Sequence, residues 1–131
     1  MQIIVFQVGT ERLGVEISGV VEIASSQSIH VNKGSAVFHN RVIPILDLYG
    51  KLNLHPMSKE CNLFIVIAWN GCQTAIPVDK VEASYTIPDS DCSPVPAIFR
   101  KAEKQCGMFL EIACLDSCLI PLIALERIFQ H

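Results

Sequence analysis

The chain has 131 residues, of which 50% are hydrophobic and 18% are charged, with 10 Lys and Arg against 13 Asp and Glu and a formal net charge of −3. A chain this apolar is not intrinsically disordered, and its length allows one domain or two small lobes that share a core. The basic residues form no cluster, so the sequence excludes nucleic acid and anionic membrane surfaces as partners.

The apolar runs are short. The longest covers residues 63–69, whereas a membrane-spanning helix needs about 20 apolar residues, so we expect no direct membrane insertion. No basic leader followed by an apolar stretch opens the chain, which favours a cytoplasmic protein with reduced thiols. A mean hydropathy of +0.40 indicates more apolar side chains than one small core can hide, and the surplus favours a partner-binding surface.

The first half of the chain is predicted to form short strands separated by turns. Residues 3–8 are rich in β-branched side chains, which suit a pleated surface. Residues 13–17 alternate apolar and polar side chains, so these two segments predict a hairpin. Further strands are predicted at 20–23, 36–38 and 41–48, with a polar loop over 25–34 and an internal boundary over 53–62.

The second half starts in the same way. The dipeptide Asn70-Gly71 is a strong hairpin-turn signal and joins predicted strands at 62–69 and 74–78. The later expectations are a strand at 81–87, a proline-rich loop at 88–96, an irregular or helical piece at 98–105, strands at 108–115 and 118–123, and a C-terminal helix from the spacing of Leu122, Leu125, Ile128 and Phe129.

The two halves resemble copies of one plan. Residues 42–48 match residues 119–125 with proline in register, which is an offset of 77 positions, whereas the opening hairpins align with an offset of 61. The difference places about 16 extra residues in the second half, within 88–105. This pattern predicts two small β-barrels within a single domain over 1–131, with approximate subdomains 1–58 and 59–131 and a cleft between them.

Motifs for catalysis are missing. The sequence contains no phosphate-binding glycine loop, no Gly-x-Ser-x-Gly elbow and no His-Glu-x-x-His motif. Its six cysteines include no Cys-x-x-Cys pair, and its four histidines are scattered. We therefore expect no enzyme, no cofactor and no metal. A small β-barrel enzyme or metal protein that brings Cys and His together in space is the alternative from another class.

Several blocks of residues, in order and at characteristic spacing, carry a resemblance to a known family. They are Val5-Phe6-Gln7-Val8-Gly9 with Gly14-Val15-Glu16-Ile17, then Val20-Val21-Glu22-Ile23, Lys33-Gly34 followed by residues 40–48, Val78-Asp79-Lys80-Val81, and residues 119–129. The most specific is the block around Pro44 and Asp47. Over nearly its whole length the chain resembles a CheW-like domain, the small adaptor of bacterial chemosensory arrays.

The resemblance implies an all-β fold of two SH3-like five-stranded β-barrels with a short C-terminal helix. It also implies a non-enzymatic adaptor that couples chemoreceptors to a CheA-type histidine kinase. In the family, barrel ends bind the kinase regulatory domain, and the groove between the barrels takes the cytoplasmic hairpin tip of the receptor. An orphan CheW-like protein that binds a single partner, in a motility or other kinase pathway, is the alternative.

The sequence departs from the family at one functional block. The family's Arg-Gly is replaced by His39-Asn40, and in the family that Arg pairs with the Glu that corresponds to Glu22. We therefore hypothesise that Glu22 pairs with His39, or that Arg41 substitutes. The candidate residues for binding or supporting a partner are Val20, Glu22, Gly34, His39 and Arg41. Each also has a purely structural interpretation: Val20 as barrel core, Gly34 as a turn, and the three polar residues as solvated surface.

Overall fold

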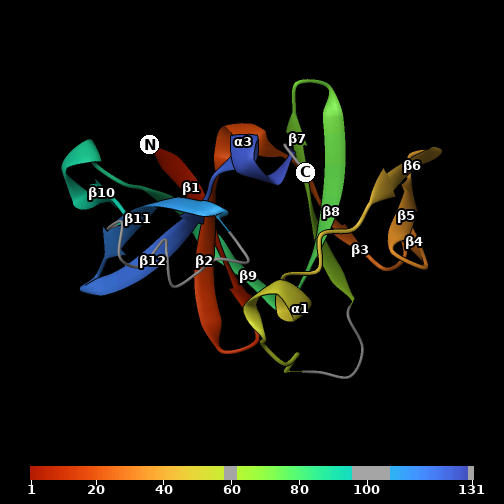
Figure 1. Cartoon of the computed structure of the whole chain (residues 1–131), viewed down its shortest axis with the longest axis horizontal. Helices are drawn as coiled ribbons and strands as arrows, with labels where there is room; N and C mark the ends of the chain where they lie inside the picture. Colours follow the sequence, from red (N-terminus) through yellow and green to blue (C-terminus); the bar gives the residue numbers. More distant parts are fainter. Residues whose placement is uncertain (58–61, 96–106, 130–131) are drawn as a thin grey trace.

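Strands make up most of the fold, and Figure 1 shows them in two groups that lie side by side. The computed structural model describes residues 1–57, 62–95 and 107–129. The strands are β1 (Gln2–Val8), β2 (Glu11–Glu16), β3 (Val20–Ser25), β4 (Ile29–Asn32), β5 (Ser35–Phe38), β6 (Arg41–Pro44), β7 (Leu63–Trp69), β8 (Cys72–Val78), β9 (Lys80–Thr86), β10 (Cys92–Pro94), β11 (Phe109–Leu115) and β12 (Cys118–Ile123). The helical pieces are α1 (Leu48–Leu52), α3 (Leu125–Ile128) and the 3-10 turns η1 (Ile17–Gly19) and η2 (Asp89–Asp91). Within the described ranges, no helix is long and apolar enough to cross a bilayer.

The two groups are β-barrel subdomains. The terminal barrel, which holds both ends of the described chain, has the strand order β10-β11-β12-β2-β1-β9. The central barrel combines the sheets β4-β5-β6 and β3-β7-β8, which are joined by a parallel bridge between Ile45 and Ala75. There, the Thr74 hydroxyl also donates a hydrogen bond of 2.8 Å to the carbonyl of Pro44. This all-β, two-barrel architecture and its C-terminal helix α3 confirm the fold class that the resemblance implied.

Each barrel contains strands from both halves of the chain, so the strand pairing does not follow the approximate subdomains 1–58 and 59–131. β1 lies antiparallel to β9, and β2 bridges to β12, so the first hairpin belongs with the last third of the chain. β3, which follows that hairpin, pairs instead with β7. Each hairpin thus takes as its third strand the one that follows the other hairpin. In this arrangement, the unpaired N–H and C=O groups at the edge of each hairpin are satisfied by the strand that follows the other hairpin.

The internal repeat is confirmed at the level of strand register. In the hairpins, Val5 pairs with Gly14 and Val66 pairs with Ala75, which is an offset of 61 on both strands. The exchanged strands obey the same offset, because Glu22 pairs with Val66 and Ala83 with Val5. In the later strands the offset is 77: the corresponding pairs are Ala36 with Ile43 and Ala113 with Ile120.

The change of offset falls between β10 and β11. This agrees with the extra residues expected within 88–105, and the irregular or helical piece expected at 98–105 lies outside the described residues. Three other expectations differ from the structure. The strand predicted over 41–48 ends at Pro44 and is followed by α1, and the loop predicted over 25–34 contains the short strand β4. The loop predicted over 88–96 contains the turn η2 and the short strand β10, which is stabilised by pairing with β11.

A shared core explains why β1 and β7 are continuously apolar. Along β1, Ile4 and Phe6 point into a large cluster that contains residues of both barrels, whereas Ile3 and Val5 point into a separate cluster inside the terminal barrel. β7 behaves in the same way toward the central barrel. Strands buried on both faces lose the alternation of a half-exposed strand. The two barrels are therefore fused along the β1 and β7 hairpins.

Candidate partner-binding site

The candidate residues gather around the outer strands of the central barrel, where two tight turns set the geometry. The turn His39-Asn40 joins β5 to β6 with φ values of 49° and 63°, the left-handed pair that a two-residue hairpin requires. The turn Lys33-Gly34 joins β4 to β5, and Gly34 has φ +82° with open space around it. Its carbonyl accepts a hydrogen bond of 3.0 Å from Ile45 N, so Gly34 holds the turn against the next strand.

The contact between Glu22 and His39 links β3 to the β5–β6 turn. The distance from His39 Nε2 to Glu22 Oε1 is 3.3 Å. The His39 ring also lies 4.2 Å, centroid to centroid, from Phe38, which is buried in the central barrel. The side chains remain 69% and 40% exposed for His39 and Glu22, so a partner can reach both. Of the two pairings left open by the sequence, the structure contains the one with His39.

The other three candidates are placed around this contact. Arg41 is exposed at the start of β6 and stands opposite Phe38 in the ladder. Val20 is half-buried, pairs with Ile67 and packs against the shared core, and a β-bulge separates it from Glu22. Gly34 lies at the opposite end of β5 from His39. The structure therefore brings Glu22 and His39 together, with Arg41 close in the ladder, and leaves Val20 and Gly34 apart from this contact.

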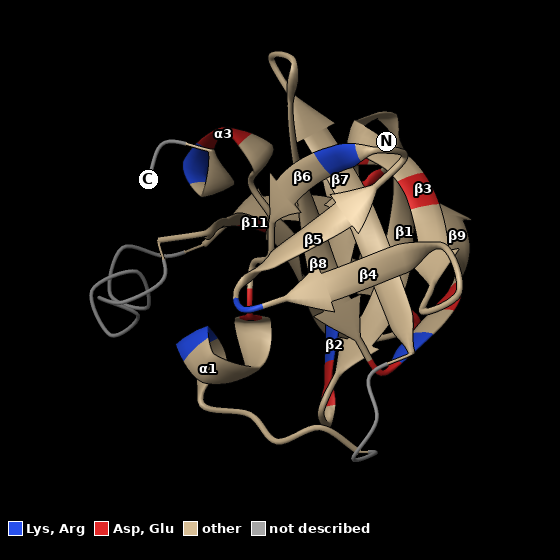
Figure 2. Ribbon diagram, turned by 90° about the vertical axis from the view of Figure 1, so that its right-hand side faces the viewer, with Lys and Arg blue, Asp and Glu red and all other residues tan. Residues whose placement is uncertain are grey.

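Exposed apolar side chains lie on β3, β5 and β6, the strands that the Glu22–His39 contact links, and sequence reasoning missed them. Val21 and Ile23 on β3 are 46% and 43% exposed, and Val37 pairs with Val42, which is 73% exposed. We call the set of Val21, Glu22, Ile23, Val37, His39 and Val42 the β3–β6 surface. Figure 2 faces β4, β5 and β6, whose ribbon is almost free of charged residues. The signal was present in the run Val20-Val21-Glu22-Ile23-Ala24, because a strand with one solvated face should alternate.

The repeat shows that the exposed apolar side chains of β3 are not shared by the equivalent strand of the terminal barrel. Val21 and Ile23 correspond to Glu82 and Ser84 on β9, the equivalent strand of the terminal barrel. Glu82 accepts a hydrogen bond of 2.8 Å from Arg12, and this bond raises the pKa of the Arg12 guanidinium, which keeps the pair ionised. One edge strand is thus polar and internally paired, and its copy is apolar and exposed.

Nothing in the described ranges resembles a reaction centre. These residues contain no group of three or more His, Cys, Asp and Glu side chains that could hold a metal ion. Cys72, Cys92, Cys114 and Cys118 are free thiols on separate strands or strand ends, and burial raises the pKa of the Cys92 thiol, which disfavours its reactive thiolate form. The alternative of an enzyme or metal protein therefore gains no support from side chains brought together in this part of the chain.

Known proteins resemble the chain over its whole length. The CheW-like domain family matches residues 2–131. A probable chemotaxis protein CheW from Rhizobium etli is 28% identical over 138 aligned positions, which cover 99% of this chain and 88% of the relative. The crystal structure of the scaffolding protein TtCheW from Thermoanaerobacter tengcongensis superimposes with a TM-score of 0.80 at 22% identity, covering 99% of this chain and 92% of that one.

The fused barrels and the exposed apolar edge define a protein that acts by binding other proteins. The chain belongs to the CheW-like domain family, and it is a non-enzymatic scaffold protein of chemotaxis.

Proposed function

We propose that this protein is a cytoplasmic adaptor that couples chemoreceptors to a CheA-type histidine kinase. The observation that carries the proposal is the contact between Glu22 and His39, because it joins the two positions at which the family resemblance expects a Glu and an Arg to pair. The β3–β6 surface binds the regulatory domain of the kinase, with Val20, Gly34 and Arg41 in supporting positions. The cytoplasmic hairpin tip of a receptor docks in the groove between the barrels.

The composition of the β3–β6 surface supports a kinase-binding role. Protein interfaces have an apolar centre, where desolvation contributes most of the affinity, and a polar periphery that fixes the orientation. Val21 and Ile23 flank Glu22 and provide exposed apolar area, while the Glu22–His39 contact provides a polar group of defined position. The equivalent strand β9 offers no such area, which favours the central barrel as the kinase-binding one.

A second candidate function is supported by one observation. His39 and Asn40 stand where the family has Arg-Gly, and a histidine offers neither the permanent charge nor the forked donors of an arginine. A weakened kinase contact would leave an orphan adaptor that binds a single partner in a motility or other kinase pathway.

Calorimetric titration with the regulatory domain of a CheA-type kinase from the same source tests the proposal. We expect binding with a dissociation constant on the order of micromolar, as for transient signalling contacts. The variants Glu22→Ala and Ile23→Ser should each weaken binding at least about fivefold, equivalent to roughly 1 kcal/mol. Glu11→Ala, an exposed carboxylate on the terminal barrel, is the matched control and should bind like the parent protein.

Either of two outcomes contradicts the kinase contact. One is the absence of binding to the regulatory domain by a protein that is folded by circular dichroism. The other is equal affinity for Glu22→Ala, Ile23→Ser and the control. If a receptor signalling fragment still binds in the first case, the single-partner function is the correct one.

A further inference from the structure

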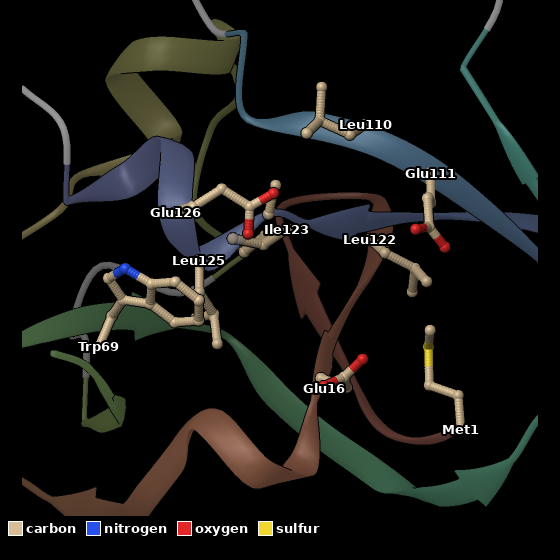
Figure 3. A pocket seen from close by; sticks show the side chains of 10 residues that line it. Met1, Glu16, Trp69, Leu110, Glu111, Leu122, Ile123, Leu125 and Glu126 are labelled. Atoms are coloured by element: carbon tan, nitrogen blue, oxygen red, sulfur yellow. The ribbon is translucent and has the colours of Figure 1, made fainter.

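A pocket of about 140 Å³ lies where the terminal barrel meets the tip of β7. Its apolar wall includes Leu122 at the end of β12, Leu125 at the start of α3 and the indole of Trp69 at the end of β7. Figure 3 shows the indole beside Leu125 on one side of the pocket. Trp69 is 38% exposed, so its ring is available to a bound group.

Three carboxylates surround this apolar wall. Glu16 ends β2, Glu111 lies on β11 and Glu126 lies on α3, and Figure 3 places their carboxylates around the pocket. Of the described residues that line it, none is Lys or Arg. Met1 also lines the pocket, and its terminal amine donates a hydrogen bond of 3.0 Å to the carbonyl of Ile87. The pocket therefore combines apolar contact area with an excess of negative charge.

The repeat shows that these carboxylates are particular to this place. By the offsets of 61 and 77, Glu16 corresponds to Pro77, Glu111 to Gly34 and Glu126 to Tyr49. None of the counterparts carries a charge. The three negative groups are therefore present at one copy of the site only and are not a feature of the repeat itself.

In the other copy, the chain itself covers the corresponding surface. Leu54 N donates a hydrogen bond of 2.8 Å to Tyr49 O, and Met57 N donates one of 2.9 Å to Asp79 Oδ1. Between them, Leu54 and His55 pass directly over Gly9 in the β1–β2 turn. In the terminal barrel, Leu122 and Leu125 line the pocket, and the Trp69 ring that also lines it is 38% exposed.

We propose that this pocket binds an arginine side chain that a protein partner presents from an apolar segment. A guanidinium group can stack on the Trp69 ring and donate paired hydrogen bonds to carboxylates, which an ammonium group does less well. Apolar residues next to the arginine would pack on Leu122 and Leu125. Because the pocket lies where the barrels meet, the inference rests on the proposed docking of a partner there, and it adds the chemistry by which that partner is selected.

The test uses the full chain and two capped peptides, acetyl-Leu-Arg-Leu-amide and its twin with citrulline, the uncharged isostere of arginine. Trp69 is the only tryptophan in the chain, so its fluorescence reports the pocket directly. We expect a saturable change with the arginine peptide, at least fivefold weaker binding of the citrulline peptide, and loss of affinity as salt is raised.

Matched variants locate the response. The double variant Glu16→Gln/Glu126→Gln should bind the arginine peptide at least tenfold more weakly than the parent protein. Glu11→Gln, at the opposite end of β2 from Glu16, should leave the affinity unchanged. The inference is overturned if Trp69 gives no saturable response, if both peptides bind equally, or if the double variant binds like the parent while remaining folded by circular dichroism.

Failure of the pocket and failure of the adaptor role are distinguishable. If the protein binds the kinase regulatory domain but does not distinguish the two peptides, only the arginine pocket is overturned. A negative kinase titration with intact, carboxylate-dependent peptide binding supports the pocket and overturns the kinase contact alone.

Discussion

At the scale of single residues, Asp79 is the clearest structural anchor. Its Oδ2 accepts hydrogen bonds from Gly9 N at 2.6 Å and from the Tyr49 hydroxyl at 2.8 Å, and its Oδ1 accepts one from Met57 N. These donors belong to the β1–β2 turn, to α1 and to the segment after α1. Asp79 thus joins the terminal barrel to the helix of the central barrel, which explains its place in a block that resembles the family.

Replacing Asp79 by alanine should destabilise the protein by about 1–3 kcal/mol, because three donors lose their acceptor at a half-buried position. Urea unfolding measures this free energy. The repeat supplies the control: Ser18 occupies the corresponding position and is exposed, so Ser18→Ala should change stability by less than about 0.5 kcal/mol. Equal losses for the two variants would show that Asp79 is not an anchor.

The Glu22–His39 contact predicts how a variant at His39 should bind the kinase. A histidine offers neither the permanent charge nor the forked donors of an arginine, so His39→Arg should bind the kinase regulatory domain more tightly than the parent protein, by about 1.5- to 5-fold. Calorimetric titration measures this change. Equal affinities of the two proteins would show that the contact with Glu22 does not contribute to kinase binding.

At the scale of elements, segments with a strong hydrophobic pattern are predicted correctly from the sequence. Segments whose structure depends on pairing with a neighbouring strand are missed. β1, β7 and the turn Asn70-Gly71 follow from local signals and are confirmed. β4 was missed although Ile29 and Val31 alternate with polar residues, because four residues give little pattern and its stability comes from pairing with β5. The apolar β3–β6 surface was also missed, because the exposure of a side chain depends on which elements pack around its strand, and the sequence of one strand does not show this.

The pairing of Glu22 with His39 was one of two options in the sequence. Residue types alone did not decide between His39 and Arg41, because the choice depends on the backbone of the β5–β6 turn. With both turn residues left-handed, the hairpin is tight enough for His39 to lie over Phe38 and reach β3. The exchange of third strands between the hairpins could not be predicted either, because β3 and β9 have similar patterns and the sequence does not show which hairpin each one joins.

Packing of η1 against α3 depends on a missing side chain. A Cβ at Gly19 would collide with the Leu125 side chain, which is itself buried at the start of α3. Gly19→Ala should therefore cost about 1–3 kcal/mol as Leu125 is displaced. Gly50→Ala in α1 is the matched control, because a Cβ there meets only the flexible Asp47 carboxylate, and its loss should not exceed about 0.5 kcal/mol. A harmless Gly19→Ala would show that α3 is not held by this contact.

At the scale of the whole molecule, the exchange of third strands makes the two barrels one cooperative unit. The largest core cluster contains Phe6 and Val15 of the terminal barrel together with Ile65 and Ile76 of the central barrel. Neither barrel can unfold without exposing the inner face of the other. A rigid relation between the barrels suits the proposed adaptor, because a receptor in the groove between the barrels and a kinase on the central barrel are then held at a fixed separation.

We expect this unit to unfold in a single transition. Trp69 fluorescence reports the central barrel, whereas far-ultraviolet circular dichroism reports the strands of both. Coincident urea curves from the two probes are the expected result for a shared core. Two separated transitions would show that the barrels are independent, and the rigid-spacer account would then be wrong.

The central claim is that the protein bridges a receptor and a kinase, and a co-sedimentation assay tests it most directly. Receptor signalling fragments from the same source are pelleted with the kinase regulatory domain, with or without the adaptor. The account predicts that the kinase domain enters the pellet only when the adaptor is present, and that Glu22→Ala still pellets with the receptor but no longer carries the kinase domain. Failure of the adaptor to bring the kinase domain down, or equal recruitment by Glu22→Ala, would contradict it.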